Sequence, residues 1–333
     1  MSMTTTRTVD VPLRTGFGFQ QAPLELTTKA FPEADHPLIP KIDDRYVFTK
    51  HAFRRLTNFL DAPRSDFFYS WGHFGTGKTS LPMQIAARLN WPVLSLDGSR
   101  DFNPDLLIGR PDLQKGAMEF LYGSLVESMI NGYIFIFNEV DSCPPGLLTA
   151  LHDVAEGRPL VLHSNGGEVV RPHKNFRMIC TGNSNGLGDT TGLYRGVQPL
   201  NRAFLDRARM NETKYPAPLV ETKILEQIIL DEYGQPEPET IRQFVEIANR
   251  TRERFTGDGL AETDERLTTV ISTRGLVQWA ELMMDYREVT KNPIRYALEE
   301  AILGAAEPED ALAITELARS IVGQNWVDDP EDD

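Results

Sequence analysis

The fold is decided by residues 72–79, which read Gly72-His73-Phe74-Gly75-Thr76-Gly77-Lys78-Thr79. They fit the pattern G-x-x-x-x-G-K-[ST], in which glycines let the backbone curl so that several N–H groups point at a phosphate. The apolar run Phe67 to Trp71 before them predicts a buried strand, and the apolar spacing from Leu81 to Leu89 predicts a helix. We therefore expect a phosphate loop between a strand and a helix, with Lys78 on the β- and γ-phosphates and the Thr79 hydroxyl on Mg²⁺.

A second apolar run, Tyr133 to Phe137, predicts another buried strand, which ends at Asn138 and Glu139. Most ATPases with this loop carry Asp and then Glu here, and the Asp orients Mg²⁺ through its bound waters. An amide accepts a hydrogen bond from such a water but brings no negative charge. Glu139 is predicted to be the general base that polarises the attacking water. Asp141 is close enough in the sequence to compensate for the missing charge.

A third apolar run, Phe176 to Thr181, predicts a strand that is followed by Asn183. Ligands of open α/β sheets lie at the carboxyl ends of the strands, so Asn183 is predicted to place the attacking water. Two arginines are further candidates. Arg207 follows a helical stretch and could reach the nucleotide of a neighbouring subunit, and Arg274 begins a later helix and could reach the γ-phosphate.

The predicted nucleotide-binding residues are the loop, its flank, one strand end and one later arginine: Gly72, His73, Phe74, Gly75, Thr76, Gly77, Lys78, Thr79, Ser80, Asn138 and Arg274. The predicted catalytic residues are Glu139, Asn183 and Arg207. The predicted Mg²⁺ ligands are Thr79 and, through water, Asn138, so the expected cofactors are ATP and Mg²⁺.

Four regions of the chain differ in pattern. Residues 1–40 hold scattered prolines and no helical period, which predicts an extended N-terminal arm. Strands alternate with helices over 41–216, which indicates a parallel sheet, whereas 217–325 show helical spacing alone. The predicted fold is therefore α/β, a parallel-sheet nucleotide domain followed by an all-helical lid, and residues 326–333 are an acidic tail. The expected helices cover 46–60, 81–89, 145–156, 220–233, 238–255, 273–286 and 311–322, and the expected strands cover 67–71, 92–96, 133–137 and 176–181.

The charge of the chain is lopsided, with 48 acidic and 34 basic residues and a formal net charge of −14. Neutralising phosphates needs a basic surface, so this balance argues against a general nucleic-acid binder. Cys143 and Cys180 make neither a zinc-site spacing nor a disulfide framework and suit a reducing compartment. No apolar run reaches the length of a membrane span and the N-terminus lacks a signal-peptide core, so we expect a cytoplasmic protein without a membrane partner.

Beyond single motifs, the chain resembles the MoxR branch of AAA+ ATPases and, within it, the CobS-type subunits of aerobic cobaltochelatase. Four stretches carry the resemblance: residues 72–78, Ala87-Arg88-Leu89-Asn90-Trp91-Pro92, Arg171-Pro172-His173, and Asn183-Ser184-Asn185-Gly186-Leu187-Gly188-Asp189-Thr190-Thr191-Gly192-Leu193-Tyr194. The run from Gly186 to Tyr194 is typical of that subgroup rather than of phosphate loops in general. The resemblance extends over about residues 38–290.

This resemblance implies a hexameric ring with ATP at the subunit interfaces, with Asn183 as sensor 1, Arg207 as the arginine finger and Arg274 as sensor 2. It also implies two β-hairpin inserts, over 107–122 and 160–171. Relatives act with von Willebrand A–type partner proteins, either as chaperones that activate them or, in cobaltochelatase, beside a large subunit that inserts Co²⁺ into a corrin. Asn138, where the family has Asp, and Pro82, early in the first helix, depart from the pattern.

Three functions remain open on the sequence. The first is a ring-forming ATPase that couples Mg-ATP hydrolysis to remodelling of a partner protein, with a cobaltochelatase-type complex as one specific case. The second is an ATP-bound structural ring that hydrolyses slowly or not at all because of Asn138. The third is a nucleic-acid remodelling ATPase, which would need basic pore loops, and its candidate residues are Arg110, Lys115, Arg171 and Lys174.

Overall fold

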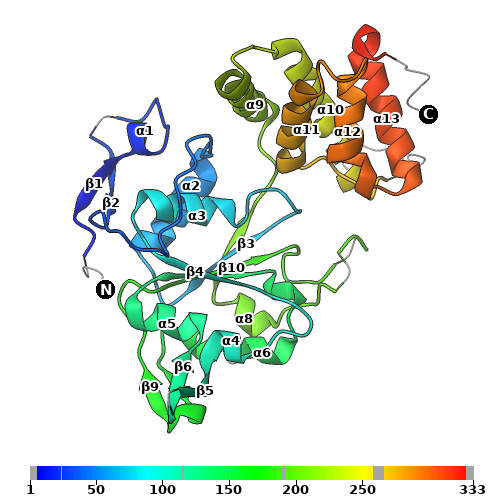
Figure 1. Cartoon of the computed structure of the whole chain (residues 1–333). Helices are drawn as coiled ribbons and strands as arrows, with labels where there is room; N and C mark the ends of the chain where they lie inside the picture. Colours follow the sequence, from blue (N-terminus) through cyan, green and yellow to red (C-terminus); the bar gives the residue numbers. More distant parts are fainter. Residues whose placement is uncertain are drawn as a thin grey trace. The chain divides into compact units, whose positions relative to one another are not determined.

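The computed structural model describes residues 6–23, 25–114, 116–149, 151–189, 192–194, 196–257 and 266–327. The chain divides into two compact units, residues 1–214 and 215–333, and each is described by itself (Figure 1). Lys115, Thr190, Thr191 and most of the predicted acidic tail lie outside the described residues. Within the described part, none of the helices combines the length and hydropathy needed to span a bilayer.

A five-stranded parallel sheet forms the centre of the first unit. Its strand order is β11 (Ala208–Glu212), β3 (Phe67–Trp71), β10 (Arg177–Gly182), β7 (Ile134–Asn138) and β4 (Val93–Asp97). Because every neighbouring pair is parallel, the carboxyl ends of all five strands meet at one edge. The α/β fold class predicted from the sequence is confirmed.

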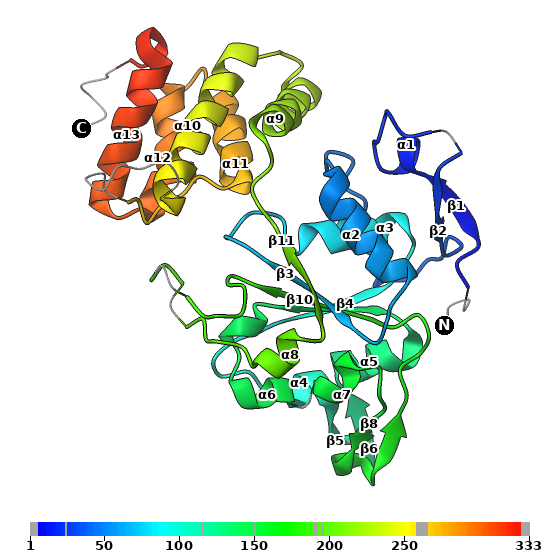
Figure 2. The same ribbon diagram turned by 180° about the vertical axis from the view of Figure 1, so that it is seen from behind.

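Side chains of alternate residues pack on opposite faces of this sheet, as the period of two requires. Phe67 and Tyr69 join one buried cluster, and Phe68 between them joins the other. Helices α2 (Lys50–Asp61) and α3 (Ser80–Arg88) cover the second face in both views (Figures 1 and 2). The first face is covered by shorter helices: α4 (Asp105–Ile108), α5 (Ser124–Asn131), α6 (Pro145–Thr149), α7 (His152–Ala155) and α8 (Arg202–Leu205).

Two antiparallel hairpins interrupt this layer where inserts are expected. The first pairs β5 (Gly109–Gln114) with β6 (Ala117–Tyr122), and the second pairs β8 (Leu160–Leu162) with β9 (Glu168–Val170). In both views they lie together beyond the helices of the first face (Figures 1 and 2). The Tyr122 hydroxyl donates to a carboxylate oxygen of Glu168 at 2.9 Å, which ties one hairpin to the other.

The N-terminal segment differs from the extended arm that the sequence predicts. Strands β1 (Val9–Pro12) and β2 (Thr27–Ala30) pair antiparallel around the short helix α1 (Leu13–Gly16). Phe17 and Phe31 are buried, and the Phe17 ring lies 4.7 Å from that of Phe53 on α2. The segment therefore packs on its own nucleotide unit, because its aromatic residues provide an apolar face that the scattered prolines obscure.

Other elements of the first unit also differ from the prediction. Strand β11 was not expected, since Ala208-Arg209-Met210-Asn211-Glu212 lacks an apolar alternation, yet it pairs with β3 at the edge of the sheet. The expected helix over 145–156 is divided into α6 and α7. The expected helix over 46–60 begins only at Lys50. Tyr46 and Phe48 lie before it, and their two rings pack edge to face on each other. Pro82 lies in the first turn of α3, where Leu81 N–H donates to the Gly77 carbonyl and Met83 N–H to the Thr79 carbonyl. Its missing N–H leaves out the one bond between these two.

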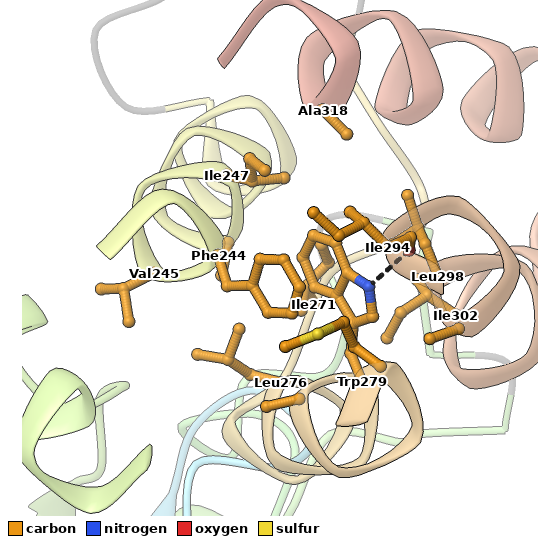
Figure 3. Close-up of a cluster of buried hydrophobic side chains, with 14 of the residues drawn as sticks. Phe244, Val245, Ile247, Ile271, Leu276, Trp279, Ile294, Leu298, Ile302 and Ala318 are labelled. Carbon is orange, nitrogen blue, oxygen red and sulfur yellow. Dashed lines mark hydrogen bonds between the residues drawn. The ribbon is translucent and has the colours of Figure 1, made fainter. Parts of the chain in front are cut away.

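The second unit is helical throughout its described elements. Its α-helices are α9 (Pro218–Tyr233), α10 (Pro238–Thr256), α11 (Thr273–Asp285), α12 (Pro293–Ala301) and α13 (Pro308–Val322). The Phe244 and Trp279 rings stack 3.7 Å apart in the core, and Trp279 Nε1 donates to the carbonyl of Ile294 at 2.9 Å (Figure 3). Helix α12, which the sequence reading missed, supplies that carbonyl as well as Ala297 and Leu298 to the core.

Candidate nucleotide-binding site

The phosphate loop joins the end of β3 to the start of α3. Gly72, Gly75 and Gly77 have φ angles of 151°, 70° and 89°, in the region that side chains rarely adopt. A Cβ atom on Gly72 would lie 2.1 Å from the carbonyl oxygen of Thr213, so only glycine fits at the first position. The backbone N–H groups of Gly77, Lys78 and Thr79 find no acceptor in the described part of the chain, so they remain available to an anion.

The Lys78 ammonium lies among neutral acceptors. Nζ donates to the carbonyls of Gly72 at 2.8 Å and His73 at 2.9 Å, and to Asn183 Oδ1 at 3.0 Å. None of the described carboxylates forms an ion pair with it. Burial lowers the pKa of Lys78 to about 8, against the raising effect of the more distant Asp141 and Glu139 charges. The site therefore holds a cation that none of the described carboxylates contacts in an ion pair.

Asn138 joins three strand ends at the edge of the sheet. Its Oδ1 accepts from the Thr79 hydroxyl at 2.8 Å and from the Thr181 hydroxyl at 3.3 Å, and its Nδ2 donates to Asp97 Oδ1 at 2.9 Å. Thr79 donates its proton to the amide, so its oxygen lone pairs remain open to a cation. Mg²⁺ prefers such oxygen ligands together with water. The residues present therefore fit a magnesium-bound nucleotide phosphate.

Glu139 follows Asn138 in a strained backbone conformation. Its φ and ψ angles are 50° and 39°, in the left-handed region, and its side chain is exposed. A Cβ atom on Gly98 would lie 2.5 Å from the Glu139 carbonyl oxygen, so glycine is needed beside the turn. In the described part of the chain the Glu139 carboxylate has no hydrogen-bond or ion-pair partner. It therefore remains available to hold a proton.

Asp141, the carboxylate that the sequence suggests as a compensating charge, forms no hydrogen bond to Asn138 among the described residues. It lies on the 3-10 helix η1 (Val140–Ser142) and is fully buried. Its Oδ2 accepts from the backbone N–H groups of Asn183 at 2.8 Å and Ser184 at 2.9 Å and from the Ser184 hydroxyl at 3.0 Å. Burial raises its pKa, against the lowering effect of these hydrogen bonds. Asp141 thus fixes the turn that carries Asn183.

The segment after Asn183 reaches back to the phosphate loop. Tyr194 hydroxyl and His73 Nδ1 lie 2.7 Å apart, and the Tyr194 backbone N–H donates to Asp189 at 2.7 Å. The backbone N–H of Gln198 donates to the Asp141 carbonyl at 2.7 Å. The sequence reading used Tyr194 only to support the resemblance and gave it no role, because no local pattern connects it to His73.

The two predicted arginines lie in different units. Arg207 follows α8 and forms an ion pair with Glu156, and its guanidinium also donates to the Ala203 carbonyl. Burial is partial on both sides of the pair, and Arg207 lowers the pKa of the Glu156 carboxyl. Arg274 belongs to α11 in the second unit, where it is exposed and makes no ion pair among the described residues.

Comparisons with known proteins agree with this arrangement of the loop, the strand ends and a helical second unit. Residues 71–208 match the family described as AAA domain (dynein-related subfamily), and residues 226–321 match the family described as CbbQ/NirQ/NorQ C-terminal. The aerobic cobaltochelatase subunit CobS of a Sinorhizobium species is 30% identical over 77% of this chain and 76% of its own length. The chain belongs to the MoxR branch of AAA+ ATPases.

Other relatives of this MoxR-branch ATPase are more distant. The uncharacterised protein YojN of Bacillus subtilis is 23% identical over 54% of this chain and 56% of its own length. A variant of RuvB from Thermotoga maritima has a TM-score of 0.51 and 14% identity over 79% of this chain and 73% of the RuvB chain. At that identity the likeness to RuvB shows the fold alone. The AAA+ assignment predicted from the sequence is confirmed by the family matches.

Proposed function

We propose that this chain is a ring-forming ATPase that couples Mg-ATP hydrolysis to remodelling of a partner protein. One observation carries the proposal. Two consecutive residues of the phosphate loop bind two separate strand ends: Lys78 donates to Asn183, which follows β10, and Thr79 donates to Asn138 at the end of β7. Structural polar clusters bury their charges in pairs, whereas this set leaves a cation and a row of N–H groups open.

Each residue of the set has a chemical task in this proposal. The N–H groups of the loop and Lys78 hold the β- and γ-phosphates, and Thr79 with Asn138 holds Mg²⁺ directly and through water. A Mg²⁺ ion held there would supply positive charge against the phosphate oxygens. Asn183 orients the attacking water and Glu139 accepts its proton, as the oxygen–phosphorus bond forms and the bond to the bridging oxygen breaks.

We assign Arg207 to the active site of a neighbouring subunit and Arg274 to the γ-phosphate of a bound nucleotide. A guanidinium supplied from outside stabilises the charge of the transition state and contributes about 10³–10⁵ in rate. In the single chain Arg207 is held by Glu156, which keeps the guanidinium positioned before a neighbour is present. Because each active site then needs two chains, this assignment requires an assembly, and we propose the hexameric ring that the family resemblance implies.

The partner is proposed from the relatives. CobS is by its name a subunit of aerobic cobaltochelatase, so we propose that this chain also works as the motor subunit of a larger complex, with a von Willebrand A–type protein as its partner. The general proposal is an ATPase that acts on a partner protein, and a cobaltochelatase-type complex is one specific case of it.

The first test measures Mg-ATP turnover against protein concentration for the wild type, Glu139→Gln and Asn138→Asp. Turnover that rises faster than linearly with concentration and is lost in Glu139→Gln supports a motor with sites shared between subunits. Tight ATP binding with negligible turnover, restored by Asn138→Asp, would instead show the alternative, a ring that holds ATP as a structural ligand.

A mixing experiment tests the shared site directly. Glu139→Gln and Arg207→Ala are each expected to be inactive alone, because one lacks the base and the other the cation for its neighbour. Mixed rings contain interfaces with an intact Glu139 and an intact Arg207, so activity should return on mixing. Arg202→Ala is the matched control, since Arg202 is an exposed arginine on α8, the short helix that precedes Arg207. Failure of the mixture to recover activity would rule out Arg207 as the residue that acts on the neighbour.

A further inference from the structure

Asp97 contacts the amide that replaces the usual carboxylate. Strands β4 and β7 are parallel neighbours, and their register places Asp97 directly opposite Asn138, at the last residue of each strand. The contact joins Asn138 Nδ2 to Asp97 Oδ1 at 2.9 Å. The register alone therefore brings a carboxylate to within one hydrogen bond of the proposed metal ligand.

This contact fixes which way the Asn138 amide faces. An amide has one end that donates and one that accepts, whereas a carboxylate only accepts. Asp97 therefore takes the Nδ2 end, and Oδ1 is left facing the hydroxyls of Thr79 and Thr181. Since Thr79 is the proposed direct ligand of Mg²⁺, Asp97 determines that an oxygen and not an NH₂ group faces the metal.

Asp97 also has the charge that Asn138 lacks. In the described part of the chain no lysine or arginine forms an ion pair with it, and its side chain is exposed toward the edge of the sheet. The other nearby carboxylates are committed elsewhere. Asp141 is buried against the turn at Asn183 and Ser184, and Glu139 is assigned to the water.

We propose that Asp97 is a positioning residue for the magnesium-bound nucleotide: it orients Asn138 and supplies the negative charge next to the metal. The inference rests on the proposed function, because it names a further residue of the same site. A purely structural role for Asp97, as a link between β4 and β7, would leave metal binding unchanged.

The test uses equilibrium binding of a fluorescent, non-hydrolysable ATP analogue to the full chain at increasing Mg²⁺. Asp97→Asn keeps an oxygen that accepts from Asn138 Nδ2, so the link between the strands persists while the charge is lost. We expect the Mg²⁺ concentration at half-saturation to rise about 10–100-fold, the usual effect of losing a residue that supports a metal ligand. Binding of the analogue in EDTA should not change.

Asp101→Asn is the matched control, because Asp101 is an exposed acid close to Asp97 in the sequence and the substitution changes the net charge equally. It should bind as the wild type does. The exchange variant Asp97→Asn/Asn138→Asp moves the carboxylate to the neighbouring strand end and should restore the wild-type Mg²⁺ requirement.

An unchanged Mg²⁺ requirement in Asp97→Asn would overturn the proposal, and so would an exchange variant no better than Asp97→Asn alone. The binding assay measures the effect of Asp97 on Mg²⁺-dependent nucleotide binding, and it does not depend on ATP hydrolysis. A wild type that binds the analogue with Mg²⁺ but hydrolyses no ATP would therefore count against the proposed function and not against Asp97.

Discussion

A cation lies in a polar network in each of the two units, and the two networks differ in what surrounds the charge. In the helical unit, Arg252 donates from both terminal nitrogens to the Glu221 carboxylate, at 2.6 and 3.0 Å, and from Nε to the Ile271 carbonyl. Glu221 is fully buried and also accepts from the Thr273 hydroxyl at 2.6 Å. In the nucleotide unit, Lys78 is partly buried among neutral acceptors only.

The difference separates a cation used for folding from one kept for a ligand. Arg252 is neutralised and saturated, and its network fixes the start of α11 through Thr273. Lys78 carries an uncompensated charge, and its burial lowers the stability of the free protein. Binding of a polyanion offsets this loss of stability. The four predictions below test this contrast, from the largest expected effect to the smallest.

Arg252→Met should destabilise the chain by about 3–5 kcal/mol, because it leaves the buried Glu221 carboxylate without its cation. Urea denaturation followed by tryptophan fluorescence measures the change. The double variant Arg252→Met/Glu221→Leu removes both charges and should recover most of the lost stability. A double variant as unstable as Arg252→Met would mean that packing and not the unpaired charge carries the effect.

Lys78→Met should have the opposite profile. Nucleotide affinity should fall by about 100-fold, which corresponds to ~2.8 kcal/mol. The free energy of unfolding should not fall, because the variant loses a desolvated charge whose partners are neutral acceptors. Titration calorimetry with ATP and urea denaturation of the same sample measure both quantities. A large loss of stability would erase the contrast with Arg252.

Nucleotide binding should weaken as pH rises above about 8, the lowered pKa of Lys78 in the free protein. Below that pH the ammonium is charged and affinity is constant. Above it, binding requires uptake of a proton, so affinity should fall by up to about tenfold per pH unit, or ~1.4 kcal/mol. Binding measured from pH 7 to 9.5 tests this. Lys78→Arg is the control, since a guanidinium stays charged and its profile should be flat over the range.

Glu246→Gln should change the free energy of unfolding by less than about 0.5 kcal/mol. Glu246 pairs with Arg250 at 2.6 Å on the same helix as Arg252, but both side chains are about half exposed. Water and salt screen such a pair. Urea denaturation at low and high salt checks the value, and an effect near that of Arg252→Met would show that burial does not explain the difference between the pairs.

The sequence predicts the central strands and the phosphate loop well, because they rest on local patterns. The predicted strand 67–71 coincides with β3, and the predicted strand 133–137 is offset by one residue from β7. A buried strand in a parallel sheet appears in the sequence as a short apolar run. Polar residues follow each run at the carboxyl end of the strand, which is the edge of the sheet where the candidate site lies. Strand β11 escapes this reasoning, since it has mixed polarity and no apolar run, and its strand structure depends on pairing with β3.

The candidate site is predictable in part for the same reason. The loop and the residues that follow the strands carry their identity in the sequence, and the structure brings Lys78, Thr79, Asn138 and Asn183 together. Other contacts of the candidate site cannot be predicted from the sequence. Glu156 beside Arg207 and Tyr194 beside His73 are distant in sequence, and no periodicity marks either pair.

The sequence by itself determined the phosphate loop, the parallel sheet and the helical second unit, since each follows from the spacing of glycines and apolar residues along the chain. Only the tertiary structure decided which carboxylate stands beside Asn138. Asp141 is near in sequence but turns away on η1 into a buried contact with Asn183 and Ser184, whereas Asp97 is distant in sequence and adjacent in the sheet. The physical reason is strand register, which pairs residues across the sheet through backbone hydrogen bonds that local sequence does not encode.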